Sequence, residues 1–332
     1  MRGKYLQSIL TTGRFILPVA VFITVIYWVT LCFLAPDSPG KGTANTFWNL
    51  QDAGFIPWWV NKPAGLFIYF VIGYLLVQIN NTFGLIRARA SIQTSIFLLL
   101  VAACPPVHFL GPEDIAVLLF VIALYLLFCA YQRPRSSGYL FHAFLFVGSG
   151  SLIFPQITLL APVLLVGAFN FQALNLRSLS AALIGWLLPY WFLFGYAFYC
   201  DNMELFRQPF IELAAFSPID FSVITTGELA VWGYSFVLFV AGSIHCLIQS
   251  HRDKIRTRVF LQFFILLNVC IYLFIALQPI HCVKLLPLSL VGVSILISHL
   301  FVLTCNMLSN IFFICSVMGL IFLFFFNVWM LL

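Results

Sequence analysis

Carboxylates that could act on a substrate fall in the polar stretches of this apolar chain. Asp52 lies among aromatic residues in the stretch 35–64, and Glu113 and Asp114 form an adjacent pair after a Gly-Pro turn. A partly buried carboxylate with a raised pKa can remove a proton from an acceptor hydroxyl, and neighbouring carboxylates can bind a divalent cation. We therefore predict Asp52, Glu113 and Asp114 as catalytic residues, with a divalent cation as candidate cofactor. Acids that only end helices would leave the same pattern.

A second set of polar residues flanks the later apolar runs. Asp201 and Glu204 are three residues apart, which places them on one face if that segment is helical. His281 could carry a proton or contact a phosphate. We predict a substrate-binding set made of Asp201, Glu204, Arg207, His281 and Lys284.

Histidines are a third source of chemistry. His142, His245 and His299 each lie near the same end of a different apolar run, and neutral imidazole is the commonest metal ligand, so this layer could ligate haem or a metal ion. Equal depth is not proximity, however. The nine cysteines contain no C-x-x-C spacing. We predict no metal site.

Membrane-spanning helices must position all of these residues. Of the 332 residues, 63% are hydrophobic and 8% are charged, whereas soluble domains carry about 25% charged residues. Roughly 20 apolar residues cross a bilayer. The sequence therefore predicts an all-α, polytopic helix bundle, one integral membrane domain over residues 1–332, whose first partner is the lipid bilayer. The positive charge sits in short loops, so we predict no nucleic-acid partner.

Eleven apolar runs are predicted as helices, at 15–34, 65–79, 91–110, 115–131, 139–154, 157–171, 181–199, 227–249, 259–277, 285–304 and 311–332. The runs 139–154 and 157–171 are short for a full crossing. The spacing of apolar residues over 205–213 is typical of a helix lying in the membrane surface.

The stretch 251–258, HRDKIRTR, orients the chain. It is the densest run of charge, with five charged residues, four of them basic. Short basic loops stay on the cytoplasmic side, so we predict a multi-pass inner-membrane protein with a cytoplasmic N-terminus and a periplasmic C-terminus. On this map twelve basic residues fall inside and four outside, and nine of the ten acids fall outside, Asp253 being the exception.

The stretch 133–190 carries a resemblance to a known family. Its basic turn RPRSSG, the hairpin YLFHAFLFVGSGSLIFPQITLLAPVLLVGAF and the run LSAALIGWLLPYW resemble an uncharacterised polytopic inner-membrane family of Bacteroidetes. Some members of that family carry a beta-carotene monooxygenase label. No cluster of histidines at ligand spacing supports an iron oxygenase in this chain.

The order of elements is also similar to that of membrane glycosyltransferases that use a polyprenyl-phosphate sugar donor. Those enzymes have about ten or more helices, an aromatic first outer loop with a catalytic carboxylate, and surface helices on the outer side. The similarity implies that Asp52 is the base, that Glu113 and Asp114 form the cation site, and that Arg207 or Lys284 contacts the lipid phosphate. This chain is shorter and lacks a clear acidic pair in the first loop.

The predicted function is therefore the handling of a lipid-linked sugar or lipid in cell-envelope glycan assembly, with the site on the periplasmic face. One alternative is a non-enzymatic scaffold or subunit of an envelope complex, with membrane-protein partners. A transporter is the other alternative, but no charged residue falls at mid-membrane, where a proton-coupled carrier usually needs one.

Overall fold

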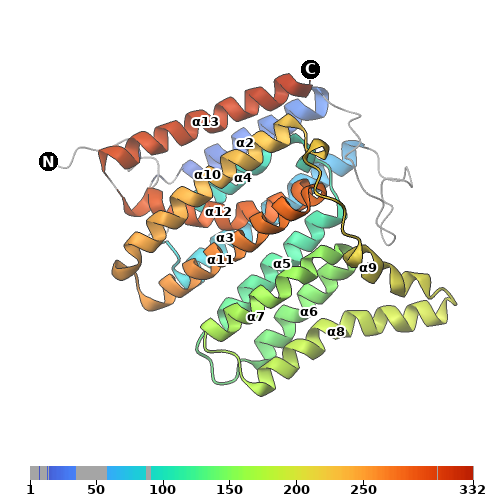
Figure 1. The fold of residues 1–332 in the computed structure, drawn as a ribbon. Helices are drawn as coiled ribbons and strands as arrows, with labels where there is room; N and C mark the ends of the chain where they lie inside the picture. The colour runs from blue at the N-terminus through green and yellow to red at the C-terminus, as the bar shows by residue number, and fades with distance from the viewer. Residues whose placement is uncertain are drawn as a thin grey trace. The chain divides into compact units, whose positions relative to one another are not determined.

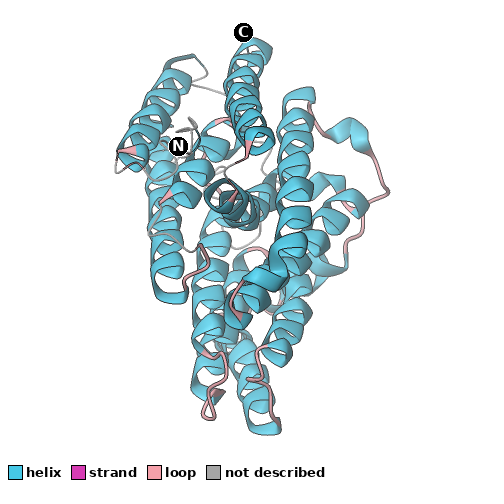
Figure 2. Ribbon diagram, turned by 90° about the vertical axis from the view of Figure 1, so that its left-hand side faces the viewer, coloured by secondary structure: helices cyan, strands magenta, loops and turns pink. Residues whose placement is uncertain are grey.

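The computed structural model describes residues 7, 13, 15–34, 58–86, 91–304 and 306–331. All regular secondary structure in this part of the chain is helical (Figure 2), which confirms the all-α prediction. Asp52, with the rest of the predicted first outer loop as far as residue 57, lies outside the described residues.

The α-helices are α2 (Ile16–Leu34), α3 (Trp58–Phe83), α4 (Ile92–Ala102), α5 (Pro112–Cys129), α6 (Ser137–Ile153), α7 (Ala161–Asn170), α8 (Leu176–Tyr199), α9 (Glu204–Ala214), α10 (Thr226–Gln249), α11 (Ile255–Leu277), α12 (Cys282–Leu303) and α13 (Met307–Leu331). Short 3-10 helices join them: η1 (Pro105–His108), η2 (Pro155–Leu160), η3 (Phe221–Val223), η4 (Ser250–Arg252) and η5 (Pro279–His281).

Eight helices in the described part of the chain are long and apolar enough to cross a membrane: α2, α3, α5, α8, α10, α11, α12 and α13. The remaining apolar segments, α4, α6 and η2–α7, are shorter. The prediction that 139–171 forms two short runs is thus confirmed. The short α4 was not predicted. Pro105 and Pro106 end it early, because a proline disfavours helical geometry in the residue before it.

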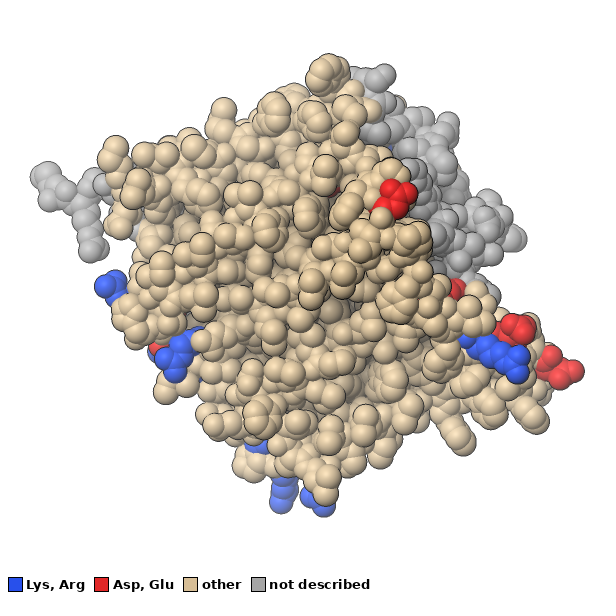
Figure 3. All heavy atoms as spheres, viewed as in Figure 1, with Lys and Arg blue, Asp and Glu red and all other residues tan. Residues whose placement is uncertain are grey.

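The surface supports a membrane location. Large apolar side chains are exposed on several of the long helices, including Phe22, Trp191 and Phe322, which are 66%, 71% and 70% exposed. On the face seen in Figure 3, charged side chains lie near helix ends and the helix flanks carry almost none. Such contiguous apolar surface is stable in lipid and costly in water. The chain is an integral membrane protein with many apolar helices.

Contacts divide the described chain into two compact units. The first unit contains α2 to α4 and α10 to α13, and the second contains α5 to α9. A single integral membrane domain over 1–332 stays a prediction.

Helix α12 is the core of the first unit. Of its candidate span, Pro279–Leu303, 94% is buried, against 22–50% for the other seven spans. It packs against α10, α11 and α4 (Figure 1). A helix surrounded on all sides is apolar all round, which is why the sequence of α12 shows no polar face.

Helix α6 is the centre of the second unit, packed between α5 and α8. Glycines permit the close approach. A Cβ atom at Gly148 would lie 2.5 Å from the carbonyl oxygen of Trp186, and one at Gly185 would overlap the carbonyl oxygen of Phe141. Small residues let membrane helices approach backbone to backbone. Gly148 and Gly185 therefore serve helix packing.

Helix α9 corresponds to the predicted amphipathic segment. Its aromatic side packs on α8, with ring centroids 5.4 Å apart for both Phe206–Phe194 and Phe210–Tyr190. The apolar spacing over 205–213 therefore does mark a helix.

The start of α3 corrects the sequence prediction. The helix begins at Trp58 rather than near residue 65, so Lys62 belongs to a helix and not to the first outer loop. Lys62 is only 2% exposed, and its ammonium group donates to the carbonyl oxygen of Leu31 at 3.4 Å. Its ammonium also lies 4.7 Å from the ring centre of Phe109. These contacts stabilise a buried cation at the end of the helix.

Candidate metal centre

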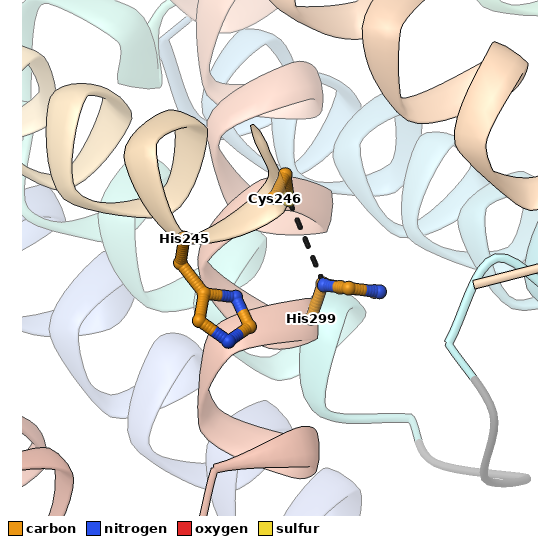
Figure 4. Close-up of side chains that lie close together, drawn as sticks. All are labelled: His245, Cys246 and His299. Atoms are coloured by element: carbon orange, nitrogen blue, oxygen red, sulfur yellow. Dashed lines mark hydrogen bonds between the residues drawn. The ribbon is translucent and has the colours of Figure 1, made fainter. Parts of the chain in front are cut away.

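His245, Cys246 and His299 converge inside the first unit, near the end of α10 and the end of α12 (Figure 4). Each offers one ligand atom, and these atoms all lie within 4.8 Å of one another. The two helices bring together residues that are 53 positions apart in sequence.

The close packing of α10 on α12 is what makes this convergence possible. A Cβ atom at Gly242 would lie 3.0 Å from the backbone nitrogen of Ile297. One turn later, the Sγ atom of Cys246 lies 3.6 Å from Nδ1 of His299. Figure 4 shows this nitrogen facing Cys246 while the other ring nitrogen points away.

Asp253 lies beside the His299 ring nitrogen that does not face Cys246. Its Oδ2 atom lies 3.2 Å from Nε2 of His299, and the side chains of His299 and Asp253 are 0% and 1% exposed. Asp253 follows η4 in the loop between α10 and α11, so this loop turns its carboxylate into the protein. A carboxylate beside Nε2 favours the proton on that nitrogen and leaves the lone pair of Nδ1 facing Cys246.

His245 supplies an independent sign of a ligand. Both of its ring nitrogens are buried, and neither has a hydrogen-bond partner among the described residues. Buried polar atoms in proteins are nearly always paired, because an unpaired one loses its hydration without compensation. A metal ion shared with the neighbouring thiol would supply a partner for one of these two nitrogens.

The donor set determines which ions fit. Two imidazoles and a thiolate suit zinc or copper. In a tetrahedral zinc site with bonds of about 2.3 Å to sulfur and 2.0 Å to nitrogen, the two ligand atoms lie about 3.5 Å apart. The observed separation of Cys246 Sγ and His299 Nδ1, 3.6 Å, is close to this value. Asp253 then completes the carboxylate–histidine–metal arrangement that orients metal-bound imidazoles.

The same residues have another interpretation, in which Cys246 is a nucleophile, His299 its base and Asp253 the orienting acid. A nucleophile must reach its substrate, but Cys246 is 4% and His299 0% exposed. This interpretation also leaves both nitrogens of His245 without a function. The geometry therefore favours a metal ion, which needs no open cleft.

The predicted catalytic pair lies in the second unit, in the first turn of α5. The Oδ2 atom of Asp114 accepts a hydrogen bond from the backbone N–H of Gly111 at 2.8 Å, and Asp114 is 2% exposed. This is the capping contact expected of an acid at the third helical position. Glu113 packs against Gly111 instead. Asp114 therefore has a structural function, and a catalytic function for the pair stays a prediction.

Three of the predicted substrate-binding residues also belong to the second unit. Asp201 occupies the left-handed region, with φ of 50°, in the turn before α9. Glu204 and Arg207 form an ion pair at 3.8 Å, with side chains 73% and 66% exposed. An exposed ion pair of this kind contributes little to stability. Because both side chains are mostly exposed, both are accessible to a ligand.

His281 and Lys284 belong to the first unit, where α12 begins. The His281 ring stacks on Phe274 with centroids 5.9 Å apart, and Lys284 is 7% exposed. Their binding function stays a prediction.

Two other acids also cap helices, Glu228 from the third helical position like Asp114 and Asp220 as the N-cap residue of η3. Glu228 accepts from the backbone N–H of Thr225 at 2.9 Å, and Asp220 accepts from that of Ser222 at 2.8 Å. The bonds from Ser222 hold the pKa of Asp220 below its usual value. Of the acids predicted to face outward, three thus satisfy helix N-termini, which supports the structural explanation for them.

The sequence prediction was that there is no metal site, and it brought together only part of this cluster. It singled out His245 and His299, but it grouped them with His142, which belongs to the second unit and bonds through Nδ1 to the carbonyl oxygen of Gly138. It missed Cys246 and Asp253. The available signals were the His-Cys dipeptide and the one acid in an otherwise basic loop.

Comparisons with known proteins give no further assignment. No family model matches the chain, and no curated protein or solved structure matches it.

Proposed function

We propose that this integral membrane protein binds a transition-metal ion, zinc foremost, through His245, Cys246 and His299. The observation that carries the proposal is the convergence of three ligand atoms within 4.8 Å at a buried position. The unpartnered nitrogens of His245 and the carboxylate of Asp253 behind His299 support it. Three protein ligands leave a fourth position for water or a further ligand.

Metal binding would fasten the end of α10 to the end of α12. These helices are already in contact, and the ion would add bonds between residues far apart in the sequence. Binding to the folded state alone stabilises a protein in proportion to the logarithm of the free metal concentration. We therefore expect zinc to raise the melting temperature of the purified protein.

The test is metal analysis of the full-length protein, purified in detergent, incubated with zinc and desalted. We expect about one zinc ion per chain. The variants His299→Gln and Cys246→Ser should lose it, whereas the matched controls His142→Gln and Cys200→Ser, at residues of the same types in the second unit, should keep it. Wild-type protein that retains less than roughly a tenth of an equivalent, measured against a known zinc protein, contradicts the proposal.

A second proposal concerns a lipid-linked sugar or lipid in envelope glycan assembly, at the periplasmic face of the inner membrane. What supports it is α9, a helix with an aromatic side on α8 and the accessible charges of Glu204 and Arg207. A scaffold or subunit of an envelope complex is the non-enzymatic alternative, and a transporter is a further one. The variants Asp52→Asn and Glu113→Gln discriminate an enzyme from a scaffold: an enzyme loses its cellular phenotype at unchanged expression, and a scaffold tolerates both.

A further inference from the structure

The loop that joins α10 to α11 has an unusual distribution of charge. We call residues 251–258 the basic loop. Among its charged residues, Arg252, Lys254 and Arg256 are exposed and Arg258 is half-buried. The loop's one acid, Asp253, has a side chain that is 1% exposed and lies against His299. The surface of the loop therefore presents cations, whereas the loop's only carboxylate is buried.

The position of the basic loop is fixed relative to the apolar helices. It joins the candidate spans Thr226–Arg252 and Ile255–Leu277. Thr257 donates a hydrogen bond to the carbonyl oxygen of Gly84 at 3.3 Å, and the Arg256 guanidinium lies 5.2 Å from the ring centre of Phe83. These contacts hold the start of α11 against the end of α3. The loop's cations thus lie where two candidate membrane helices end, a position at which Lys and Arg side chains can reach lipid headgroups.

An apolar side chain accompanies these cations. Ile255, the first residue of α11, is 64% exposed. Arginine and lysine at a helix end can contact the anionic headgroup of a lipid, and the exposed apolar residue beside them can contact its acyl chain.

We propose that the basic loop is a docking surface for anionic phospholipid headgroups. Charge complementarity selects the ligand, because clustered Lys and Arg next to a membrane helix attract anionic lipids and not zwitterionic ones. The Asp253–His299 contact maintains the surface by keeping a negative charge away from it. This inference rests on the loop itself and does not require the proposed metal ion.

The test uses full-length protein in detergent, titrated with phosphatidylglycerol or with phosphatidylcholine of the same acyl chains. Native mass spectrometry counts the retained lipids. We expect phosphatidylglycerol to bind at least about tenfold more tightly, and increasing salt should weaken it by screening. Equal retention of the two lipids overturns the proposal. Competition by millimolar inorganic phosphate also overturns it, because the ligand would then be a phosphate and not a lipid.

Matched double variants separate a site from a general effect of net charge. Lys254→Gln with Arg258→Gln removes two cations from the basic loop, and Arg133→Gln with Arg135→Gln removes two from the second unit. We expect the first pair to lower phosphatidylglycerol affinity by about tenfold and the second by less than about threefold. Equal losses would mean that net charge alone attracts the lipid, and an acidic peptide that displaces it would point to a protein partner. Either result contradicts the proposal.

The effect of the buried Asp253 carboxylate on lipid binding can be tested separately. His299→Gln removes the partner of Asp253 and lets the carboxylate return to the loop, so affinity should fall by about threefold or more. Adding Asp253→Asn to His299→Gln should restore the affinity, because the returned group is then neutral. If the double variant binds no better than His299→Gln, the carboxylate does not control the surface.

Discussion

The imidazole of His299 and the carboxylate of Asp253 form a buried pair, with Nε2 and Oδ2 3.2 Å apart. Asp253 is the only acid that the predicted topology places on the inner side, and its side chain is buried. The pair connects the loop between two helices to the interior of the bundle. It also leaves the other nitrogen of His299 facing Cys246.

The variant Asp253→Asn tests the function of this pair in metal binding. Loss of the carboxylate removes the group that orients His299 and raises its basicity, so zinc affinity should fall by about 10- to 100-fold while the ligands remain. Competition against a zinc-chelating dye measures the change. Asp220→Asn, at an exposed capping residue, should leave the affinity unchanged. Wild-type affinity in Asp253→Asn would show that the pair does not support the metal.

The reactivity of Cys246 distinguishes a metal ligand from a nucleophile. A zinc-bound thiolate should react with a maleimide more slowly than the same thiol after chelation, and mass spectrometry of the labelled peptides gives both rates. Cys200, which is exposed, should label at the same rate in both conditions. Rapid labelling of Cys246 that zinc does not change would favour the nucleophile.

His108 predicts a pH dependence of stability. The residue is 2% exposed and stacks on Trp28 with centroids 3.7 Å apart. Burial lowers the pKa of His108 from 6.5 to about 3. Between these values the unfolded chain binds a proton that the folded chain does not, so the free energy of unfolding decreases as the pH falls below about 6.5. Lowering the pH from 7.5 to 5 should cost about 2 kcal/mol.

Thermal unfolding in detergent at several pH values measures this effect. His108→Phe keeps an aromatic ring against Trp28 but removes the titrating group, so its melting temperature should change less between pH 7.5 and 5. The exposed variant His251→Phe is the control and should follow the wild type. An unchanged slope in His108→Phe would show that another group controls the pH response.

The predicted orientation can be tested by labelling in intact cells. A cysteine introduced as Lys254→Cys should be protected from a membrane-impermeant maleimide applied to the periplasmic side, because short basic loops remain cytoplasmic. Phe216→Cys, in the exposed segment after α9, should react. Labelling of Lys254→Cys in cells with an intact inner membrane would reverse the assignment of every loop.

Much of the fold could be predicted because long runs of apolar residues identify membrane helices in a sequence. Each of the eleven predicted apolar runs overlaps one α-helix, and α9, the remaining α-helix of the described residues, is the predicted amphipathic segment. The errors are at the ends, as at Trp58, where α3 starts within a stretch whose Lys62 and Pro63 look like loop residues. A buried lysine with a carbonyl partner cannot be distinguished from a solvated one by residue type.

The candidate site was less predictable. Acids such as Asp114 and Glu228 look available in the sequence, but the structure uses their oxygens to satisfy backbone N–H groups, and capping depends on geometry within one helical turn. The two units also separate the predicted residues, with His281 and Lys284 in one and Glu204 and Arg207 in the other. Proximity within either unit follows from helix packing, which the loop positions do not specify.

The sequence by itself determined that this is a helical membrane protein, where its apolar segments run, and which loop concentrates positive charge, because hydropathy and charge are sums over local residues. Only the tertiary structure decided that Cys246 and His245 meet His299, and that Asp253 turns inward to support it. The physical reason is that α12 is buried on every side, so its sequence does not indicate which neighbouring helix each of its faces contacts. The close approach at Gly242 fixes that choice in three dimensions.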